Sequence, residues 1–132
     1  MTAPPPSATE TTDTLGHRFV VALAAKDGAR MKALVHPSVD FRAVTPGRCW
    51  EAAGAEAVVD EVFLGTWFAT ERRITALDGL ESQRIGAMER IRYRLEVELP
   101  DGRCLVEQQA YLRCGQGQIT SMWLVCSGFV SW

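Results

Sequence analysis

The sequence lacks the features of a membrane-spanning, secreted or nucleic-acid-binding protein. No apolar run approaches the ~20 residues that cross a bilayer, and residues 1–13 contain neither the basic nor the apolar segment of a secretory signal. The net charge is −2, whereas phosphate binding needs a local excess of Lys and Arg. We therefore expect a cytoplasmic protein that binds neither nucleic acid nor a membrane.

Motifs for metals and nucleotides are also missing. The four cysteines, at positions 49, 104, 114 and 126, form no CxxC pair and have no spacing typical of metal ligands. Free thiols are the default in a reducing cytosol, so we expect neither a disulfide nor a metal. The sequence has no P-loop, GxSxG, HExxH or GxGxxG motif. We accordingly expect a protein without a cofactor.

The length and composition fit one globular domain. The chain has 132 residues, of which 47% are hydrophobic, and a chain of this size can bury a core without a disulfide or a metal. Its first residues are rich in Pro, Ser and Thr and have almost nothing to bury. We predict a disordered tail over residues 1–12 and a single domain over residues 13–132.

Helical patterns dominate the first half of the chain. Residues 15–26 have an apolar stripe of helical spacing, and a short second helix over residues 31–36 stops before Pro37. A third helix is expected from Gly54 to Trp67, because its apolar residues recur on one side. Strand patterns then take over, which predicts the α+β class, with the helices packed on one face of a sheet.

The strands are expected as a short hairpin followed by a longer meander. Residues 39–43 alternate in polarity, and residues 49–51 can pair back after the turn at Pro46-Gly47. The later strands are expected at residues 74–77, 84–99, 105–112 and 118–126. An antiparallel sheet that curves around a helix leaves a conical cavity, which is a common place for an apolar ligand.

This order of elements resembles the nuclear transport factor 2 superfamily, in particular its polyketide-cyclase-like (SnoaL-like) and ketosteroid-isomerase-like branch. The segments that carry the resemblance are residues 19–27, 34–41 and 117–119. The resemblance implies a cone-shaped α+β fold with three N-terminal helices packed on a strongly curved antiparallel sheet. The superfamily contains isomerases, cyclases, epoxide hydrolases, dehydratases and binders without catalytic activity, so the fold does not decide the activity.

The usual residues of a ketosteroid isomerase are not found at the matching positions. Phe19 stands where the isomerases have a tyrosine oxyanion donor, and Arg42 or Ala43 stands where they have the aspartate base. Gln109 matches the second oxyanion donor, and its amide can still donate a hydrogen bond. Proton transfer on a steroid by the usual residues is therefore not expected.

The resemblance points to one face of the strand at residues 105–112 as the catalytic face. If Gln109 lines the cavity, so do Glu107 and Tyr111, which lie about 7 Å from it along the strand. Burial raises the pKa of a carboxyl group toward neutrality, so Glu107 becomes the candidate general acid and base. Gln109 and Tyr111 would orient the substrate or stabilise an oxyanion, and Asp40 is a second acid candidate. The alternative is a solvated polar face.

The substrate pocket is expected to take its remaining walls from apolar and aromatic side chains. Those expected to bind substrate are Phe19, Trp50, Phe63, Trp67, Tyr93, Met122, Leu124 and Cys126. Aromatic residues also dominate protein cores, so core packing is the alternative for this cluster. Cys126 has no signature of a thiol enzyme around it, and is expected as a pocket wall.

The combined hypothesis is a cofactor-independent acid/base enzyme. It would be of the cyclase, isomerase or hydratase type and act on a small, mostly apolar polyketide-like or carbonyl substrate. The alternative is a small-ligand-binding or protein-interaction module without catalysis. We also expect a homodimer, because apolar residues on the other strand face would need a partner. The residues of this expected interface are Val106, Ala110, Leu112, Trp123 and Val125.

Overall fold

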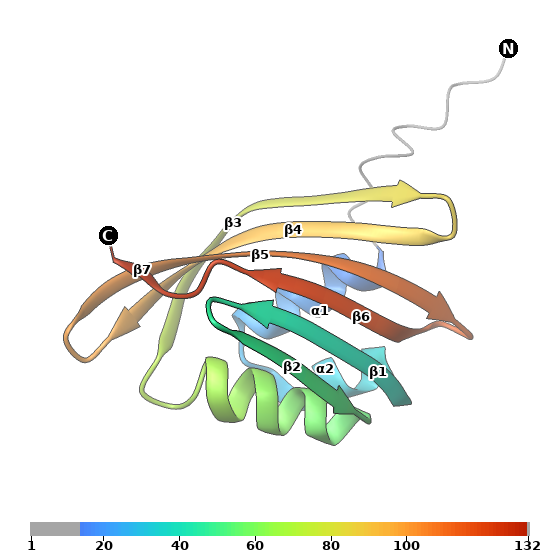
Figure 1. Ribbon diagram of the computed structural model, residues 1–132, viewed down its shortest axis with the longest axis horizontal. Coiled ribbons are helices and arrows are strands. Elements are labelled where there is room, and N and C mark those ends of the chain that lie inside the picture. The colour runs from blue at the N-terminus through green and yellow to red at the C-terminus, as the bar shows by residue number, and fades with distance from the viewer. Residues whose placement is uncertain (1–13, 132) are drawn as a thin grey trace, which may run out of the picture.

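The computed structural model describes residues 14–131 (Figure 1), so the predicted tail over residues 1–12 lies outside them. In this range the chain forms three helices and a curved, unclosed sheet of seven strands, which confirms the α+β class. The helices are α1 (Leu15–Ala24), α2 (Gly28–Leu34) and η1 (Ala57–Trp67). The strands are β1 (Val35–Thr45), β2 (Arg48–Ala53), β3 (Arg73–Ile85), β4 (Met88–Leu99), β5 (Gly102–Gly115), β6 (Gln118–Cys126) and β7 (Val130–Ser131).

The sheet is mixed and not purely antiparallel as expected. Its strand order is β2-β1-β6-β5-β4-β3, and β7 pairs with β5. The pairs β1–β2, β3–β4, β4–β5 and β5–β6 are antiparallel hairpins, but β1 pairs with β6 in parallel, with Phe41 opposite Met122. No hairpin joins these two strands, so their relative direction follows from the whole fold and not from a local turn.

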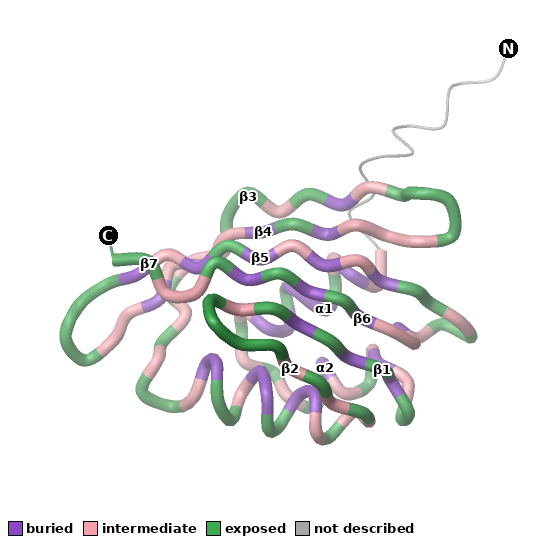
Figure 2. Tube along the Cα trace, in the orientation of Figure 1, coloured by how far each residue is buried: buried purple, intermediate pink, exposed green. Residues whose placement is uncertain are grey.

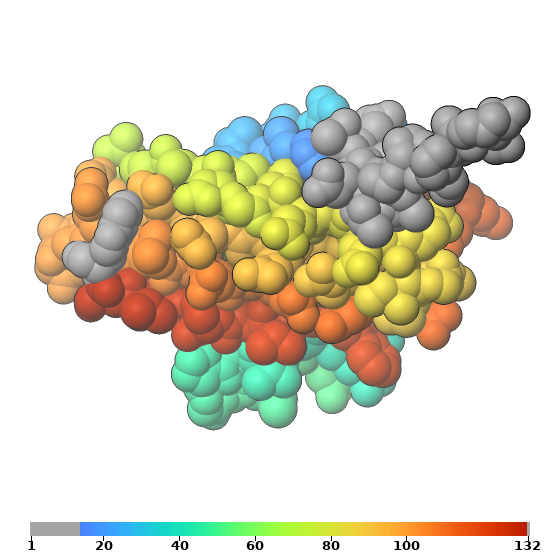
Figure 3. Space-filling model, turned by 90° about the horizontal axis from the view of Figure 1, so that it is seen from above, coloured from blue at the N-terminus to red at the C-terminus, as the bar shows by residue number. Residues whose placement is uncertain are grey.

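The expected long strand over residues 84–99 is in fact divided by a turn. β3 ends at Ile85 and β4 begins at Met88, and Gly86 between them has a φ of 59°. Glycine adopts such a positive φ without the strain that a Cβ atom would cause. Strands β3 to β6 lie side by side on the surface in Figure 3, with the β1–β2 hairpin beside them.

Helix α1 covers the inner face of the sheet, where it contacts β3, β4 and β6. Thr14 caps it by accepting a hydrogen bond from the His17 N–H at 3.0 Å. Its buried apolar stripe includes Phe19 and Leu23, as the spacing predicts. Within the described range, no helix is long and apolar enough to cross a membrane.

The third helix occupies the expected place but is wound more widely than an α-helix. It is a π-helix, and the Phe68 N–H donates to the Phe63 carbonyl at 2.7 Å, which is an i→i+5 hydrogen bond. A Cβ atom at Gly65 would lie 2.3 Å from the Asp60 carbonyl oxygen. The wide turn therefore leaves no room for a side chain at Gly65, and it determines how Trp67 and Phe68 are presented at the helix end.

Strand β5 alternates strictly between a buried and a more exposed face (Figure 2). The buried face carries Cys104, Val106, Gln108, Ala110 and Leu112. Gln108, at 2% exposure, is the polar exception in an otherwise apolar row. This alternation decides which side chains of β5 can reach a cavity on the inner side.

Candidate functional site

Three polar side chains form a row across the inner face of the sheet. Tyr93 on β4, Gln108 on β5 and Cys126 on β6 are direct cross-strand partners. The Tyr93 hydroxyl donates to Gln108 Oε1, and Gln108 Nε2 donates to Cys126 Sγ at 3.3 Å. Side chains paired in this way hold one another in place, so the sheet fixes the orientation of the Gln108 amide.

The Gln108 amide has more hydrogen-bonding capacity than its neighbours use. Its nitrogen carries two N–H groups, and among residues 14–131 it bonds only the sulfur of Cys126, which is a weak acceptor. Burial raises the pKa of Tyr93 well above its ordinary value, so the phenol stays protonated and remains a donor to Gln108. One amide N–H of Gln108 is left without an acceptor in this part of the chain.

Gln108 lines a cavity of about 470 Å³ between the β1–β2 hairpin, the end of η1 and the inner face of β5 and β6. We refer to it as the Gln108 cavity. Its walls include Trp50, Trp67, Phe68, Val106, Cys126 and Phe129. The volume is typical of sites for small organic molecules, which are mostly apolar with a few polar groups.

The aromatic walls of the cavity pack edge to face. Trp67 lies with its ring centroid 5.6 Å from that of Trp50 and 5.0 Å from that of Phe63, within the favourable range for such pairs. The Trp67 indole N–H is buried and has no hydrogen-bond partner among the described residues. Buried donors without a partner are rare in proteins, so this wall holds a second unused donor.

The segment after η1 closes one side of the cavity and is anchored to the turn between α1 and α2. The Lys26 ammonium donates to the carbonyls of Ala69 at 2.9 Å and Arg72 at 2.6 Å. Partial burial lowers the pKa of Lys26. These bonds hold the wall formed by Phe68 and Arg72 against the rest of the domain.

The structure contradicts the predicted inward orientation of Glu107, Gln109 and Tyr111. These three side chains lie on the more exposed face of β5, away from the Gln108 cavity. Glu107 is exposed and lies 3.4 Å from Arg94, while Gln109 accepts from Arg90 at 3.2 Å and donates to the Tyr111 hydroxyl at 3.0 Å. The prediction placed the strand one residue out of phase, because the resemblance and not the apolar alternation set the faces.

Asp40 also lies away from the Gln108 cavity. It is exposed on β1, and its carboxylate lies 3.9 Å from the Arg42 guanidinium. Side chains that alternate along a strand point to opposite faces, and Asp40 is out of phase with the buried Val39 and Phe41. Asp40 and Arg42 therefore form an ion pair at the surface.

The predicted substrate-binding residues divide between cavity and core. Trp50, Trp67 and Cys126 line the Gln108 cavity, and Tyr93 lies behind Gln108. Those that belong to the buried core without lining this cavity are Phe19, Phe63, Met122 and Leu124. Gln108 and Phe129 also line the cavity and were not among the predicted site residues. A single glutamine among alternating apolar residues at 106, 110 and 112 was the signal that could have found the first of them.

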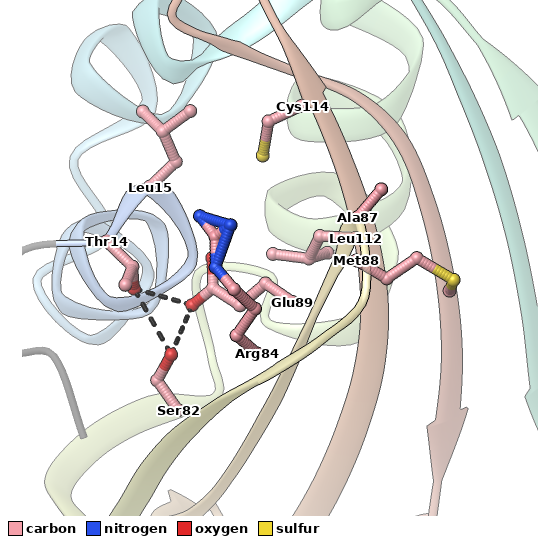
Figure 4. A pocket seen from close by; sticks show the side chains of 9 residues that line it. All are labelled: Thr14, Leu15, Ser82, Arg84, Ala87, Met88, Glu89, Leu112 and Cys114. Atoms are coloured by element: carbon pink, nitrogen blue, oxygen red, sulfur yellow. Dashed lines mark hydrogen bonds between the residues drawn. The ribbon is translucent and has the colours of Figure 1, made fainter. Parts of the chain in front are cut away.

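A separate pocket, of about 300 Å³, lies at the beginning of α1 (Figure 4). At its centre Glu89 Oε2 accepts from the hydroxyls of Thr14 at 2.5 Å and Ser82 at 2.6 Å, and Oε1 accepts from the Gly16 N–H at 3.1 Å. We refer to Thr14, Gly16, Ser82 and Glu89 as the Glu89 cluster. Its carboxylate caps the positive end of a helix, so its hydrogen bonds serve the fold.

The outer face of the sheet does not carry the whole predicted dimer interface. Val106, Ala110 and Leu112 are buried inside the domain, so that part of the prediction is wrong for the same reason as the inward Glu107. Trp123 and Val125 are 55% and 56% exposed and border a shallow apolar groove of about 460 Å³. The homodimer stays a prediction, and of its predicted interface residues only Trp123 and Val125 are exposed.

No group of three or more His, Cys, Asp or Glu side chains within residues 14–131 could hold a metal ion.

No protein-family model matches the chain, and no curated protein matches it. Solved structures do match. One is a Catenulispora acidiphila protein described as having a ketosteroid isomerase-like fold, in complex with trimethylamine. It has 14% identity and a TM-score of 0.71, with 89% of this chain and 88% of that one covered.

Two further structures agree with this fold. A proposed polyketide cyclase from Pseudomonas putida is 14% identical, with a TM-score of 0.68 and coverage of 86% of this chain and 90% of that one. An NTF2-like protein of unknown function from Cytophaga hutchinsonii is 15% identical, with a TM-score of 0.56 and coverage of 96% and 95%. The chain thus has the fold of NTF2-like, polyketide cyclase-like and ketosteroid isomerase-like proteins. At these identities the likeness concerns the fold alone.

Proposed function

We propose that this protein binds a small, flat, largely apolar molecule with a hydrogen-bond-accepting oxygen, such as a ketone, in the Gln108 cavity. The observation that carries the proposal is the buried Gln108 amide with an unused N–H at the wall of an aromatic cavity. Leaving a buried donor unsatisfied costs about 1–3 kcal/mol. An occupant with an acceptor oxygen removes that cost, which an apolar occupant cannot do.

The remaining walls favour an aromatic or alicyclic body for this ligand. Trp50, Phe68 and Phe129 offer ring faces and edges, and burial of apolar area stabilises by about 25 cal/mol per Å². The proposal places this body in the conical cavity that the resemblance implies, with its oxygen toward β5.

A cofactor-independent enzyme of the cyclase, isomerase or hydratase type is the second candidate. The bond from Tyr93 to Gln108 favours it, because a phenol that stays protonated polarises the amide. A polarised amide N–H can stabilise negative charge that develops on a carbonyl oxygen. The lining of the Gln108 cavity contains no described Asp, Glu or His, so the candidate base is Cys126 in its thiolate form, which takes up the substrate proton to become a thiol.

Binding of matched ligands tests the first proposal. We compare 2-acetylnaphthalene with 2-ethylnaphthalene by equilibrium dialysis, since the two have similar shapes and differ in the carbonyl oxygen. We expect the ketone to bind about tenfold more tightly, as one net hydrogen bond of about 1.4 kcal/mol gives. Gln108→Leu should abolish this preference, whereas Gln109→Leu, on the other strand face, should preserve it.

Equal affinity of the two compounds for the wild-type protein would overturn the role of Gln108. Failure of both to bind would overturn the proposed cavity ligand. Exchange of the methyl protons of 2-acetylnaphthalene in D₂O, followed by NMR, tests the enzyme. Exchange above the buffer rate that Cys126→Ser abolishes would support catalysis, and exchange at the buffer rate leaves binding as the function.

A further inference from the structure

We infer that the ligand of the Gln108 cavity is an acid whose carboxylate lies between Arg48 and Arg72 at the cavity rim. This inference rests on the proposed function and specifies its ligand class. Both arginines line the cavity, and its described lining includes no Asp or Glu. The cavity therefore has two positive charges in a chain whose net charge is −2.

Arg48 is held in a position that leaves its hydrogen-bonding edge unused. It begins β2, and the central carbon of its guanidinium lies 3.6 Å from the centroid of the Trp50 ring. This stacking uses the flat face of the guanidinium, whereas its N–H groups point outward in the plane. Within the described chain, the Arg48 guanidinium has no ion pair and no hydrogen bond.

Arg72 reaches the same cavity from the segment between η1 and β3. Its Nη1 donates to the carbonyls of Thr66 at 3.1 Å and Trp67 at 3.0 Å, and its guanidinium lies 4.6 Å from the centroid of the Phe129 ring. These contacts fix the plane of the group. Its Nε and Nη2 have no partner among residues 14–131, so an acceptor can approach that side.

Elsewhere in the molecule, arginines near carboxylates form pairs with them. Arg73 lies 2.9 Å from Glu98, and Arg94 lies within 4.0 Å of both Asp78 and Glu107. In a purely structural account, Arg72 binds the last carbonyls of η1 and Arg48 covers the ring of Trp50. That account leaves two like charges beside one cavity without an opposite charge, whereas a bound carboxylate supplies one and accepts charge-assisted hydrogen bonds.

The two ends of the cavity then define the ligand. The carboxylate lies at the rim with Arg48 and Arg72, the ring system lies against Trp50, Phe68 and Phe129, and a second oxygen reaches Gln108. The ligand class is an aromatic or alicyclic carboxylic acid with a carbonyl or hydroxyl group at the opposite end. A cationic ligand is disfavoured, because it would meet two guanidinium groups.

The test compares 2-naphthoate with 2-naphthamide, which has the same shape without the charge. At pH 7.5 and low salt we expect the carboxylate to bind at least about tenfold more tightly. The difference should shrink in 0.5 M NaCl, because salt screens charges near the surface. Arg48→Gln should remove most of the preference for the carboxylate over the amide, whereas Arg113→Gln, on an exposed part of β5, should leave that preference intact.

The outcomes separate this inference from the proposed function. Suppose that 2-acetylnaphthalene binds with the expected dependence on Gln108 while naphthoate and naphthamide bind equally. The inference that the ligand is a carboxylic acid is then wrong, whereas the proposed binding of a small molecule in the Gln108 cavity is supported. If none of the compounds binds, the proposed function itself fails. Arg48→Gln removes an exposed side chain and should fold, which circular dichroism checks. Retention of the full preference for naphthoate in that variant would overturn the role of Arg48.

Discussion

Glu89 and Gln108 are polar side chains on the inner face of the same sheet, but their hydrogen bonding differs. The Glu89 carboxylate accepts from two hydroxyls and a backbone N–H, all from the described chain. The Gln108 amide accepts from Tyr93 and leaves one N–H with no described acceptor. The Glu89 carboxylate, whose two oxygens both accept hydrogen bonds, serves the fold. The Gln108 amide, which has an unused N–H, is the group available to a ligand.

This difference changes how a site is sought on this fold. The resemblance predicts a carboxylate over a cavity, at Glu107. The structure has a half-buried carboxylate on its inner face, at Glu89, but its oxygens are occupied by the beginning of α1 (Figure 4). Unused hydrogen-bonding capacity is therefore a better guide here than charge.

The largest effect on stability is expected from Glu89→Ala. This change leaves the hydroxyls of Thr14 and Ser82 and the Gly16 N–H without their acceptor, and hydrogen bonds to charged groups contribute about 1.5–3 kcal/mol. We expect a loss of about 3 kcal/mol in the free energy of unfolding, measured with urea. Glu98→Ala, which breaks the exposed pair with Arg73, should cost less than about 1 kcal/mol. Equal losses in the two variants would mean that the hydrogen bonds of the Glu89 cluster contribute no more to stability than the exposed pair of Arg73 and Glu98.

A smaller loss is expected from Tyr93→Phe, which deprives Gln108 Oε1 of its donor. An unsatisfied buried acceptor costs about 1–3 kcal/mol, and we expect a loss of about 2 kcal/mol in urea. The freed amide should also lose orientation, so the preference for ketone over hydrocarbon should fall. A variant as stable and as selective as the wild type would mean that Tyr93 does not hold Gln108.

Alkaline pH provides an independent measure of the same contact. Because burial raises the pKa of Tyr93 in the folded protein, the unfolded chain loses this proton first, near pH 10. The unfolded state then binds fewer protons, so stability falls as the pH rises above about 10, by up to about 1.4 kcal/mol per pH unit. The difference in unfolding free energy between wild type and Tyr93→Phe should therefore shrink from pH 9 to pH 11. A constant difference would contradict the burial of this hydroxyl.

The smallest effect on the fold is expected from Trp123→Arg, on the outer face. Its side chain is 55% exposed, so we expect a change in unfolding free energy within about 0.5 kcal/mol. If the predicted homodimer forms through Trp123 and Val125, light scattering should give a dimer for the wild type and a monomer for this variant. Monomers in both cases at micromolar concentration would reject the dimer.

The α+β class and the positions of the three helices could be predicted from the sequence, because local periodicity and turn residues determine them. The faces of β5 could not be taken from a resemblance, since residues 107–109 are polar on both faces. The apolar residues at 106, 110 and 112 carried the correct alternation. The turn at Gly86 was missed because a single glycine, between Ile85 and Ala87, is its only signal in the sequence.

The candidate site was harder to predict because it depends on contacts between distant segments. Trp50 and Trp67 line the Gln108 cavity, and their predicted role in binding a substrate stays a prediction. The row of Tyr93, Gln108 and Cys126 exists only through the register of three strands. Arg48 and Arg72 come from a hairpin and a connecting segment, and no sequence pattern links them.

The parallel pairing of β1 with β6 has a consequence for the order in which the protein forms on the ribosome. β1 is made early, yet one of its two edges pairs with a strand that begins only at Gln118. Until β6 emerges, the β1–β2 hairpin has an open edge, which is a template for unwanted strand pairing. Contacts between such distant segments also form slowly. A nascent chain that stops before Gln118 therefore lacks the strand that joins β1 to β5, and β6 with the segment after it completes both the sheet and the cavity.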